Sequence, residues 1–180
     1  MVPRLRAFRN GFTLLELLTV IVIISILSLL GSAVFMGWEG KAARAACQSN
    51  LRVLYTGAPA YLTDNEVWPQ IPTTDIHDPQ YAIAWVKVFQ PYGVAPKNWI
   101  CPAVQKALGN MDYNQYPRVD YFAMPFGDKP RAAFLYPTQP WFVERADIHG
   151  DGNLVIFTNG STGSVQEILT TMPKDSGAQW

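Results

Sequence analysis

The feature that most limits how this chain can fold is an apolar run from Phe12 to Met36, which contains a single charged residue, Glu16. The run is 25 residues long, and as an α-helix it would rise about 1.5 Å per residue, roughly 37 Å in all. A hydrocarbon core is about 30 Å thick, so a helix of this length can cross a membrane. A removable secretory signal is the weaker interpretation, because its apolar stretch is only about 7–15 residues and ends in a small-residue cleavage site.

Positive charge precedes the apolar run. Arg4, Arg6 and Arg9 lie there with no acidic residue among them, which predicts a cytoplasmic N-terminus and transfer of everything after Met36 across the inner membrane. Over the whole chain, 14 Lys and Arg balance 14 Asp and Glu. We therefore expect a single-pass membrane protein with a periplasmic head and no nucleic acid partner.

Glu16 is unusual, because a carboxylate within lipid costs about 3 kcal/mol on insertion scales. Two interpretations are open from the residues alone. The side chain can reach back to the depth of the headgroups, as long polar side chains do near helix ends. Alternatively, it has a functional partner, which is the usual reason for an ionisable residue in a membrane segment.

The basic stub, the sequence Gly-Phe-Thr-Leu-Leu-Glu-Leu that begins at Gly11, and the apolar run together resemble the class III signal of type IV pilins and type II secretion pseudopilins. The resemblance implies that a prepilin peptidase cuts between Gly11 and Phe12 and methylates the new amine of Phe12. It also implies that Glu16, the fifth mature residue, meets the N-terminal amine of a neighbouring subunit. The implied partners are the peptidase, an inner-membrane assembly platform and other pilin or pseudopilin subunits of a filament.

Beyond Met36, apolar residues recur at helical spacing among polar ones, so the helix is expected to continue. Gly57 and Pro59 predict that it ends or bends between residues 56 and 64. Most of the chain's 14 prolines and 13 glycines follow residue 56, which predicts a loop-rich head of short elements. The expected parts are a leader (1–11), a transmembrane and filament-core helix (12–36), its amphipathic continuation (37–63) and a globular head (64–180).

Short elements are expected within the head. We expect a helix at Tyr81–Gln90, short strands at Asn98–Cys101, Val119–Ala123 and Trp141–Glu144, and a β-hairpin within Asn153–Ile168. In that hairpin, LVIF and VQEI are the two strands that flank the turn. The predicted fold class is α+β, with a long N-terminal helix whose second half packs on a small antiparallel sheet, like the lollipop shape of a pilin.

Two cysteines, Cys47 and Cys101, both follow the apolar run and would lie on the oxidising side of the membrane. One alternative is a disulfide, which would stabilise the fold by roughly 4 kcal/mol in the chain-entropy model. The other alternative is a pair of buried free thiols. Neither cysteine fits a metal-binding or nucleophile motif.

Oxygen-bearing side chains gather in the sequence ADIHGDGN, where Asp147, Asp151 and Asn153 are candidate calcium ligands. The spacing differs from the twelve-residue calcium loop, and Asp-Gly and Gly-Asn are common in turns, so a turn without metal is the favoured interpretation. His149 is interpreted as a turn-capping or core histidine. We expect no cofactor, and no arrangement of catalytic side chains points to an enzyme.

Further stretches, among them CQSNLRVL, WICP and HGDGNLVIFTNG, resemble a large group of prepilin-type proteins of environmental bacteria. In that group the last stretch usually has Asp and His where this chain has Asn159 and Ser161, which argues against a metal role there. The sequence therefore predicts a structural filament subunit. The alternatives are a membrane-anchored periplasmic binding module that does not polymerise and, less favoured, a secreted enzyme with an unusual signal.

Overall fold

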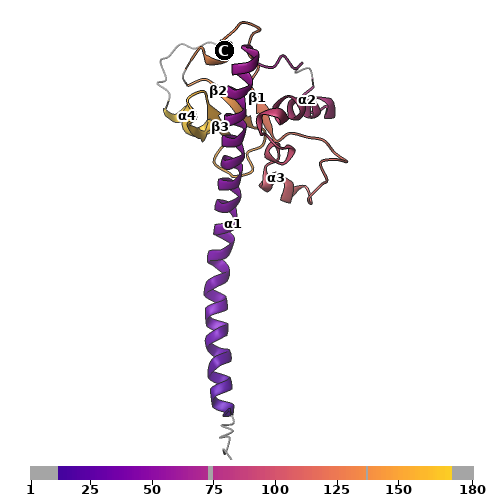
Figure 1. Cartoon of the computed structure of the whole chain (residues 1–180). Coiled ribbons are helices and arrows are strands. Elements are labelled where there is room, and N and C mark those ends of the chain that lie inside the picture. Colours follow the sequence, from indigo (N-terminus) through magenta and orange to yellow (C-terminus); the bar gives the residue numbers. More distant parts are fainter. Residues whose placement is uncertain (1–11, 73–74, 137, 172–180) are drawn as a thin grey trace, which may run out of the picture. The chain divides into compact units, whose positions relative to one another are not determined.

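The structure is a computed structural model that describes residues 12–72, 75–136 and 138–171, without the side chains of residues 30–37, 169 and 171. The predicted leader, including Gly11, lies outside the described residues. The chain divides into two compact units, Met1–Glu39 and Gly40–Trp180. The helices and strands are α1 (Leu14–Asn65), α2 (Pro79–Phe89), α3 (Pro102–Ala107), β1 (Tyr121–Ala123), β2 (Pro140–Glu144), β3 (Leu154–Phe157), β4 (Thr162–Ser164) and α4 (Val165–Thr171), with 3-10 helices at Gln90–Tyr92, Pro96–Trp99 and Ala132–Phe134 (Figure 1).

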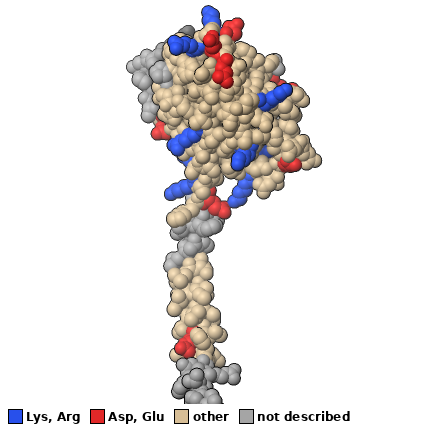
Figure 2. Space-filling model, in the orientation of Figure 1, with Lys and Arg blue, Asp and Glu red and all other residues tan. Residues whose placement is uncertain are grey.

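The first half of α1 makes up the described part of the N-terminal unit. Every large apolar side chain between Phe12 and Leu29 is exposed, and the least exposed of them, Val20, still shows 45% of its surface. On the face that Figure 2 shows, the described surface of this part is almost free of charge. Within the described residues, no helix is both long and apolar enough to cross a membrane. The predicted span includes positions 30–36, whose side chains lie outside the description.

The second half of α1 belongs to the C-terminal unit and is amphipathic. One face is at most 6% exposed, and it consists of Cys47, Leu51, Leu54, Ala58 and Leu62. These positions recur every three or four residues, as helical periodicity requires. The helix continues through Gly57 and Pro59 and ends at Asn65, one residue beyond the predicted range. Burial on both sides of Pro59 holds the helix together although the proline lacks an N–H group.

The sheet has four strands in the order β1-β2-β3-β4, and each neighbouring pair is antiparallel. It packs on the second half of α1, where the rings of Tyr55 and Trp141 lie 5.3 Å apart. On β1, the hydroxyl of Tyr121 donates a hydrogen bond to the carbonyl oxygen of Cys47, at 3.3 Å. A helix that carries a small antiparallel sheet confirms the predicted α+β class.

The helix predicted at Tyr81–Gln90 is confirmed as α2. It begins where Asp78 accepts a hydrogen bond from the Gln80 N–H at 2.8 Å, with Pro79 in the first turn, an arrangement that favours a helix start. The strands predicted at Val119–Ala123 and Trp141–Glu144 are confirmed as β1 and β2.

The strand predicted at Asn98–Cys101 is wrong. A 3-10 helix, Pro96–Trp99, includes the first two residues of this stretch, and no residue of the stretch is in a strand. Its proline has a φ angle already suited to a helical turn, and the side chain of Asn98 accepts a hydrogen bond from the N–H of Ala95 at 3.1 Å. These two local features outweigh the strand preference of Trp99 and Ile100.

The predicted hairpin is confirmed only in its first strand, β3. Its partner strand is β4, Thr162–Ser164, and the VQEI sequence that was expected to be a strand forms helix α4. The Ser164 hydroxyl oxygen accepts a hydrogen bond from the Glu167 N–H at 3.1 Å. Serine followed three residues later by glutamate is a signature of a helix start, so local capping ends the strand here.

Tryptophan dominates the core of the C-terminal unit. Four tryptophans are at most 2% exposed, namely Trp68, Trp85, Trp99 and Trp141. Trp68 lies at the centre, with ring centroids 5.6 Å from Trp141 and 6.1 Å from Trp85, separations at which aromatic rings attract each other. The tryptophans of this core are therefore structural and do not form a surface for a ligand.

Gly57 marks the closest approach of α1 to the chain that follows α2. A Cβ atom added at Gly57 would lie 2.5 Å from Cγ2 of Val94 and 3.2 Å from Cδ1 of Phe89. We predict that Gly57→Ala lowers the free energy of unfolding by about 1–3 kcal/mol through overpacking, although alanine favours a helix. Gly40→Ala is the matched control, because nothing lies within 4 Å of that position.

The measurement is thermal unfolding of the full chain in detergent, followed by tryptophan fluorescence. The control should be stabilised by up to about 1 kcal/mol, which is the difference in helix propensity between glycine and alanine. Equal effects of the two substitutions would contradict the close packing described for Gly57.

Candidate functional site

The start of α1 is built around Thr13 and Glu16. One carboxylate oxygen of Glu16 accepts hydrogen bonds from the N–H of Thr13 at 3.0 Å and from the Thr13 hydroxyl at 2.9 Å. In return, the Glu16 N–H donates to the Thr13 hydroxyl oxygen at 3.2 Å. This reciprocal pattern is a capping box, in which residues three apart satisfy N–H groups that a helix start leaves without partners.

The capping box gives Glu16 a role that sequence reasoning missed. Threonine followed three residues later by glutamate, before an apolar run, is a known signal for a helix start, so the signal was present in the sequence. Phe12, the predicted first mature residue, directly precedes this turn and is 79% exposed. Within one chain the carboxylate of Glu16 is thus held by its own helix turn, beside the position where cleavage would create an amine.

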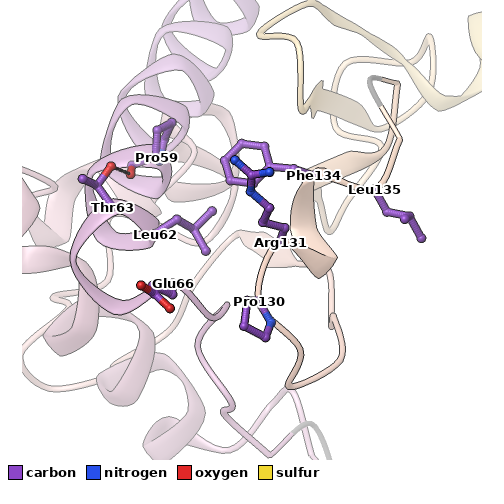
Figure 3. Close-up of a pocket in the computed structure, with 8 residues that line it drawn as sticks. All are labelled: Pro59, Leu62, Thr63, Glu66, Pro130, Arg131, Phe134 and Leu135. Carbon is purple, nitrogen blue, oxygen red and sulfur yellow. Dashed lines mark hydrogen bonds between the residues drawn. The ribbon is translucent and has the colours of Figure 1, made fainter.

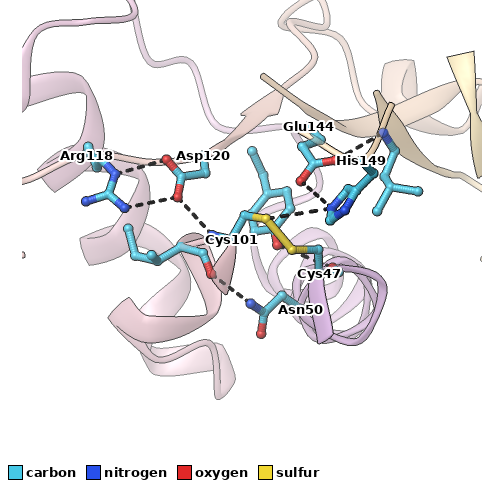
Figure 4. The surroundings of a disulfide bond; sticks show 10 residues. Cys47, Asn50, Cys101, Arg118, Asp120, Glu144 and His149 are labelled. Atoms are coloured by element: carbon cyan, nitrogen blue, oxygen red, sulfur yellow. Dashed lines mark hydrogen bonds and ion pairs between the residues drawn. A yellow bond between two sulfur atoms is a disulfide. The ribbon is translucent and has the colours of Figure 1, made fainter. Parts of the chain in front are cut away.

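In the C-terminal unit, Cys47 and Cys101 are joined by a disulfide, one of the two alternatives that the sequence left open (Figure 4). Both residues are fully buried, and their Cα atoms are 5.2 Å apart. Cys47 lies on α1, whereas Cys101 directly precedes α3. The bond therefore ties the helix to the middle of the unit.

Polar contacts hold the Cys101 side of the disulfide. The carboxylate of Asp120 accepts a hydrogen bond from the Cys101 N–H at 2.8 Å, and Arg118 pairs with the same carboxylate at 3.1 Å. Burial raises the pKa of Asp120, and the hydrogen bond from Arg118 opposes that shift. On the other side, Asn50 of α1 donates to the carbonyl oxygen of Ile100 at 2.9 Å.

A buried pair of ionisable side chains lies against the disulfide. Oε1 of Glu144 is 3.4 Å from Nε2 of His149, and the two side chains are 0% and 4% exposed. The same nitrogen is 3.9 Å from the sulfur of Cys101. Burial raises the pKa of Glu144 to about 7 although its carboxylate accepts a hydrogen bond from the Leu154 N–H, and burial lowers the pKa of His149.

Sequence reasoning named His149 but missed Glu144. Residues two apart on a strand point to the same face, which places Glu144 on the face of Phe142, a core residue. The sequence WFVE has no alternation, because its first three residues are all apolar. It therefore gave no signal for which face of the strand meets the core, and the structure was needed to place Glu144.

The three candidate calcium ligands are each used in other contacts. Asp147 accepts hydrogen bonds from the N–H groups of Gly150 and Gly152, at 2.9 and 3.1 Å. Asp151 forms an ion pair with Arg44. The amide of Asn153 donates to the carbonyl oxygen of Glu144 at 2.7 Å. The loop thus has the hydrogen bonds of a turn that is fastened to α1 and β2.

One cluster of His, Cys, Asp and Glu side chains within the described residues could hold a metal ion. It consists of Cys47, Cys101, Glu144 and His149, whose candidate ligand atoms all lie within 4.8 Å of one another. In the structure the two sulfurs are bonded to each other, so they are not thiolate ligands in this state. The cluster is distinct from the calcium candidates that the sequence suggested.

A surface hollow of about 730 Å³ lies between the C-terminal end of α1 and the chain before β2 (Figure 3). It is lined by Pro59, Leu62, Thr63, Glu66, Pro130, Arg131, Phe134 and Leu135. Glu66 and Arg131 both have φ angles in the left-handed region, 62° and 65°. Its lining includes none of the residues that the sequence singled out for function.

Comparison with known proteins identifies the N-terminal segment. Residues 6–32 match the prokaryotic N-terminal methylation motif, which is the leader signature of type IV pilins and pseudopilins. The N-terminal segment thus carries the leader signature that is typical of structural pilin-type subunits and that prepilin peptidase recognises. No curated protein and no solved structure matches the chain.

The capping box can be tested with Thr13→Val, which keeps the shape of the side chain and removes the hydroxyl. We predict that this loss weakens the start of α1 by about 0.5–2 kcal/mol, the usual range for a lost N-cap. The N–H groups of Glu16 and Leu17 both donate to Thr13, and their hydrogen exchange, measured by NMR in detergent micelles, should become roughly 2- to 30-fold faster.

Thr19→Val is the control, because the Thr19 hydroxyl donates to the carbonyl oxygen of Glu16 within the helix and caps no N–H group. It should leave exchange at the first turn nearly unchanged. Equal protection of Glu16 and Leu17 in the wild type and in Thr13→Val would contradict the capping role.

Glu144 should make the stability of the C-terminal unit depend on pH. Its folded pKa of about 7 lies above the ordinary value of 4.5, so the stability it contributes is complete below pH 4.5 and is lost as the pH rises through 7. A glutamine side chain at this position cannot ionise. We therefore predict that Glu144→Gln gains stability relative to the wild type, by up to about 3 kcal/mol, between pH 4.5 and 8.

The measurement is chemical denaturation of both proteins across this range, with the disulfide intact and a chelator present. The contribution of His149 runs in the opposite direction below pH 6.5, because its folded pKa is lowered. Because His149 contacts Glu144, the titrations of the two groups are coupled, and the comparison is repeated in a His149→Gln background to remove this contribution from both proteins. A difference in free energy of unfolding that stays constant with pH would refute the prediction.

Proposed function

We propose that this chain is a subunit of a type IV pilus-like or type II secretion filament. It is first inserted in the bacterial inner membrane as a single span, with its N-terminus in the cytoplasm and its C-terminal unit in the periplasm. Prepilin peptidase cuts between Gly11 and Phe12 and methylates Phe12. Subunits then leave the membrane at an assembly platform and polymerise through α1.

The observation that carries the proposal is the methylation motif over residues 6–32, with glycine before the expected cut and an aromatic residue after it. Glycine leaves an unhindered backbone at a cleavage site. The arginines at positions 4, 6 and 9 support a cytoplasmic N-terminus, which is where the proposal places the cut.

The exposed apolar surface of α1 supports polymerisation. A helix that is apolar on all sides requires an apolar environment around its whole circumference. Lipid supplies this environment before assembly, and neighbouring helices supply it in a filament. Ser25 and Ser28 donate their hydroxyl groups to carbonyl oxygens one turn earlier, at 2.7 and 2.8 Å, so these small side chains satisfy their own polar groups and permit close helix packing.

Glu16 is proposed to guide assembly. After cleavage, the amine of Phe12 on one subunit meets the carboxylate of Glu16 on its neighbour. Loss of one partner of a buried ion pair costs about 3–5 kcal/mol, because the other charge is left uncompensated. This pair fixes the axial position of one helix against the next.

Glu16→Gln separates the charge of this residue from its capping role, because glutamine also serves in a capping box. We predict that the variant is inserted, cut and methylated as the wild type is, but enters filaments at least about 10-fold less. Asp64→Asn removes an exposed carboxylate near the other end of the same helix and should leave filament yield unchanged. The yield is measured in the native host by quantifying the protein in sheared filaments.

Mass spectrometry of the mature N-terminus tests the processing step. A methylated Phe12 is the expected result. An intact Met1 would overturn the proposal in favour of a membrane-anchored binding module, and a cut beyond residue 30 would overturn it in favour of a secreted protein. If Phe12 is methylated and Glu16→Gln forms filaments at the wild-type level, processing stands but the proposed role of the charge fails.

A further inference from the structure

We propose that the C-terminal unit, when its disulfide is reduced, binds a zinc ion through Cys47, Cys101, His149 and Glu144. Two thiolates, one imidazole and one carboxylate form a ligand set that suits Zn²⁺. The inference concerns this unit alone and does not depend on filament formation.

The distances fit a tetrahedral site. With Zn–S bonds of about 2.3 Å and Zn–N or Zn–O bonds of about 2.0–2.1 Å, tetrahedral geometry puts a nitrogen and an oxygen ligand roughly 3.3 Å apart, and a sulfur and a nitrogen roughly 3.6 Å apart. The structure has 3.4 Å between Nε2 of His149 and Oε1 of Glu144. It has 3.9 Å between Nε2 of His149 and the sulfur of Cys101.

The two sulfurs must move apart for both to bind the metal. In a tetrahedral zinc site they lie roughly 3.8 Å apart, a separation that rotation of the two side chains about their Cα–Cβ bonds can provide once the S–S bond is cut. All four candidate ligand atoms already lie within 4.8 Å of one another. The backbone therefore places the four ligands before any metal arrives.

An independent observation points to a missing ligand. Glu144 is 1% exposed, and its Oε1 atom accepts no hydrogen bond, whereas its other oxygen is held by the Leu154 N–H at 3.4 Å. Buried carboxylate oxygens without a donor are rare because they lose their hydration without replacement. Oε1 faces His149 and the sulfurs (Figure 4), which is where a cation would satisfy it.

The supports of the ligands are rigid. Cys47 lies on α1 with its carbonyl oxygen bound by the hydroxyl of Tyr121, and the N–H of Cys101 is held by Asp120. Glu144 ends a strand paired on both sides. Outer contacts of this kind orient metal ligands and tune their affinity.

The two states of the unit would cross-link the same segments. Reduction adds two electrons and two protons to the S–S bond. A phosphine reductant supplies the electrons and becomes a phosphine oxide, with its oxygen and the two protons taken from water. Binding of Zn²⁺ then releases the two thiol protons. A disulfide thus joins α1 to the start of α3 under oxidising conditions, and a metal joins them under reducing conditions.

The experiment uses the full chain in detergent, reduced with a phosphine that is then removed without air, and titrated with Co²⁺ as a spectroscopic substitute for Zn²⁺. We expect one equivalent to give thiolate-to-cobalt charge transfer and the strong visible absorption of a tetrahedral site, and Zn²⁺ to remove both. His149→Gln and Glu144→Gln should each weaken Co²⁺ binding at least about 10-fold, since even losses in the outer shell of a metal site cost about 10- to 100-fold.

His77→Gln is the matched control. The chain has two histidines, and the exposed His77 contacts Arg145 away from the cluster, so this variant should bind Co²⁺ as the wild type does. Circular dichroism of each oxidised variant verifies its fold. The proposal is overturned if the reduced wild type shows no thiolate-to-cobalt signal, if the oxidised protein binds equally well, or if His149→Gln retains the wild-type affinity.

Discussion

The C-terminal unit depends on one interaction, the burial of a single face of α1 against the sheet and the tryptophan core. Leu51 and Leu54 have no exposed surface, and full burial of each such side chain contributes about 1.5–3 kcal/mol. Gly57 allows the following chain to come close enough to complete this contact. Because the second half of α1 is one continuous helix, its buried face determines the positions of the disulfide, the sheet and the 3-10 helices.

Periodicity accounts for what could be predicted of the fold. Helical spacing continued beyond Met36 and predicted the second half of α1, because the spacing of apolar residues records which side chains face the core. The errors have a different cause. At Pro96–Trp99 and after Ser164, hydrogen bonds from backbone N–H groups to short polar side chains help decide the backbone path. Such local bonds leave little trace in the distribution of apolar residues.

The candidate site was predictable to different degrees. Gly11, Phe12 and Glu16 could be named because a linear motif contains them within six residues. The cysteines could be named and a disulfide between them stated as one alternative, but the sequence could not decide between a disulfide and free thiols, because 54 positions separate them. Glu144 and His149 meet only because a strand end and the following turn bring them to one sulfur atom, and such a meeting depends on tertiary structure that spacing alone does not encode.

Glu144 and Glu16 differ in the hydrogen bonds that stabilise their negative charge. Glu144 sits deep in the core, where one backbone N–H is its hydrogen-bond donor and burial dominates its pKa. Glu16 instead has two donors from Thr13 within its own turn. These donors lower the cost of holding a charge in an apolar helix, so the chain can carry the carboxylate before any partner arrives.

The same local donors affect how strongly a partner could be held. In the proposed filament, the amine of a neighbouring subunit would meet a carboxylate that already accepts two hydrogen bonds. The free energy gained on assembly would then be that of the ion pair minus that of the capping hydrogen bonds which the amine displaces or shares. It would be smaller than the free energy of an ion pair that forms without competing hydrogen bonds. A contact of this kind would favour one axial position of the helices. Glu16 would therefore supply the charge of this contact, and the hydrogen bonds from Thr13 would reduce its net strength.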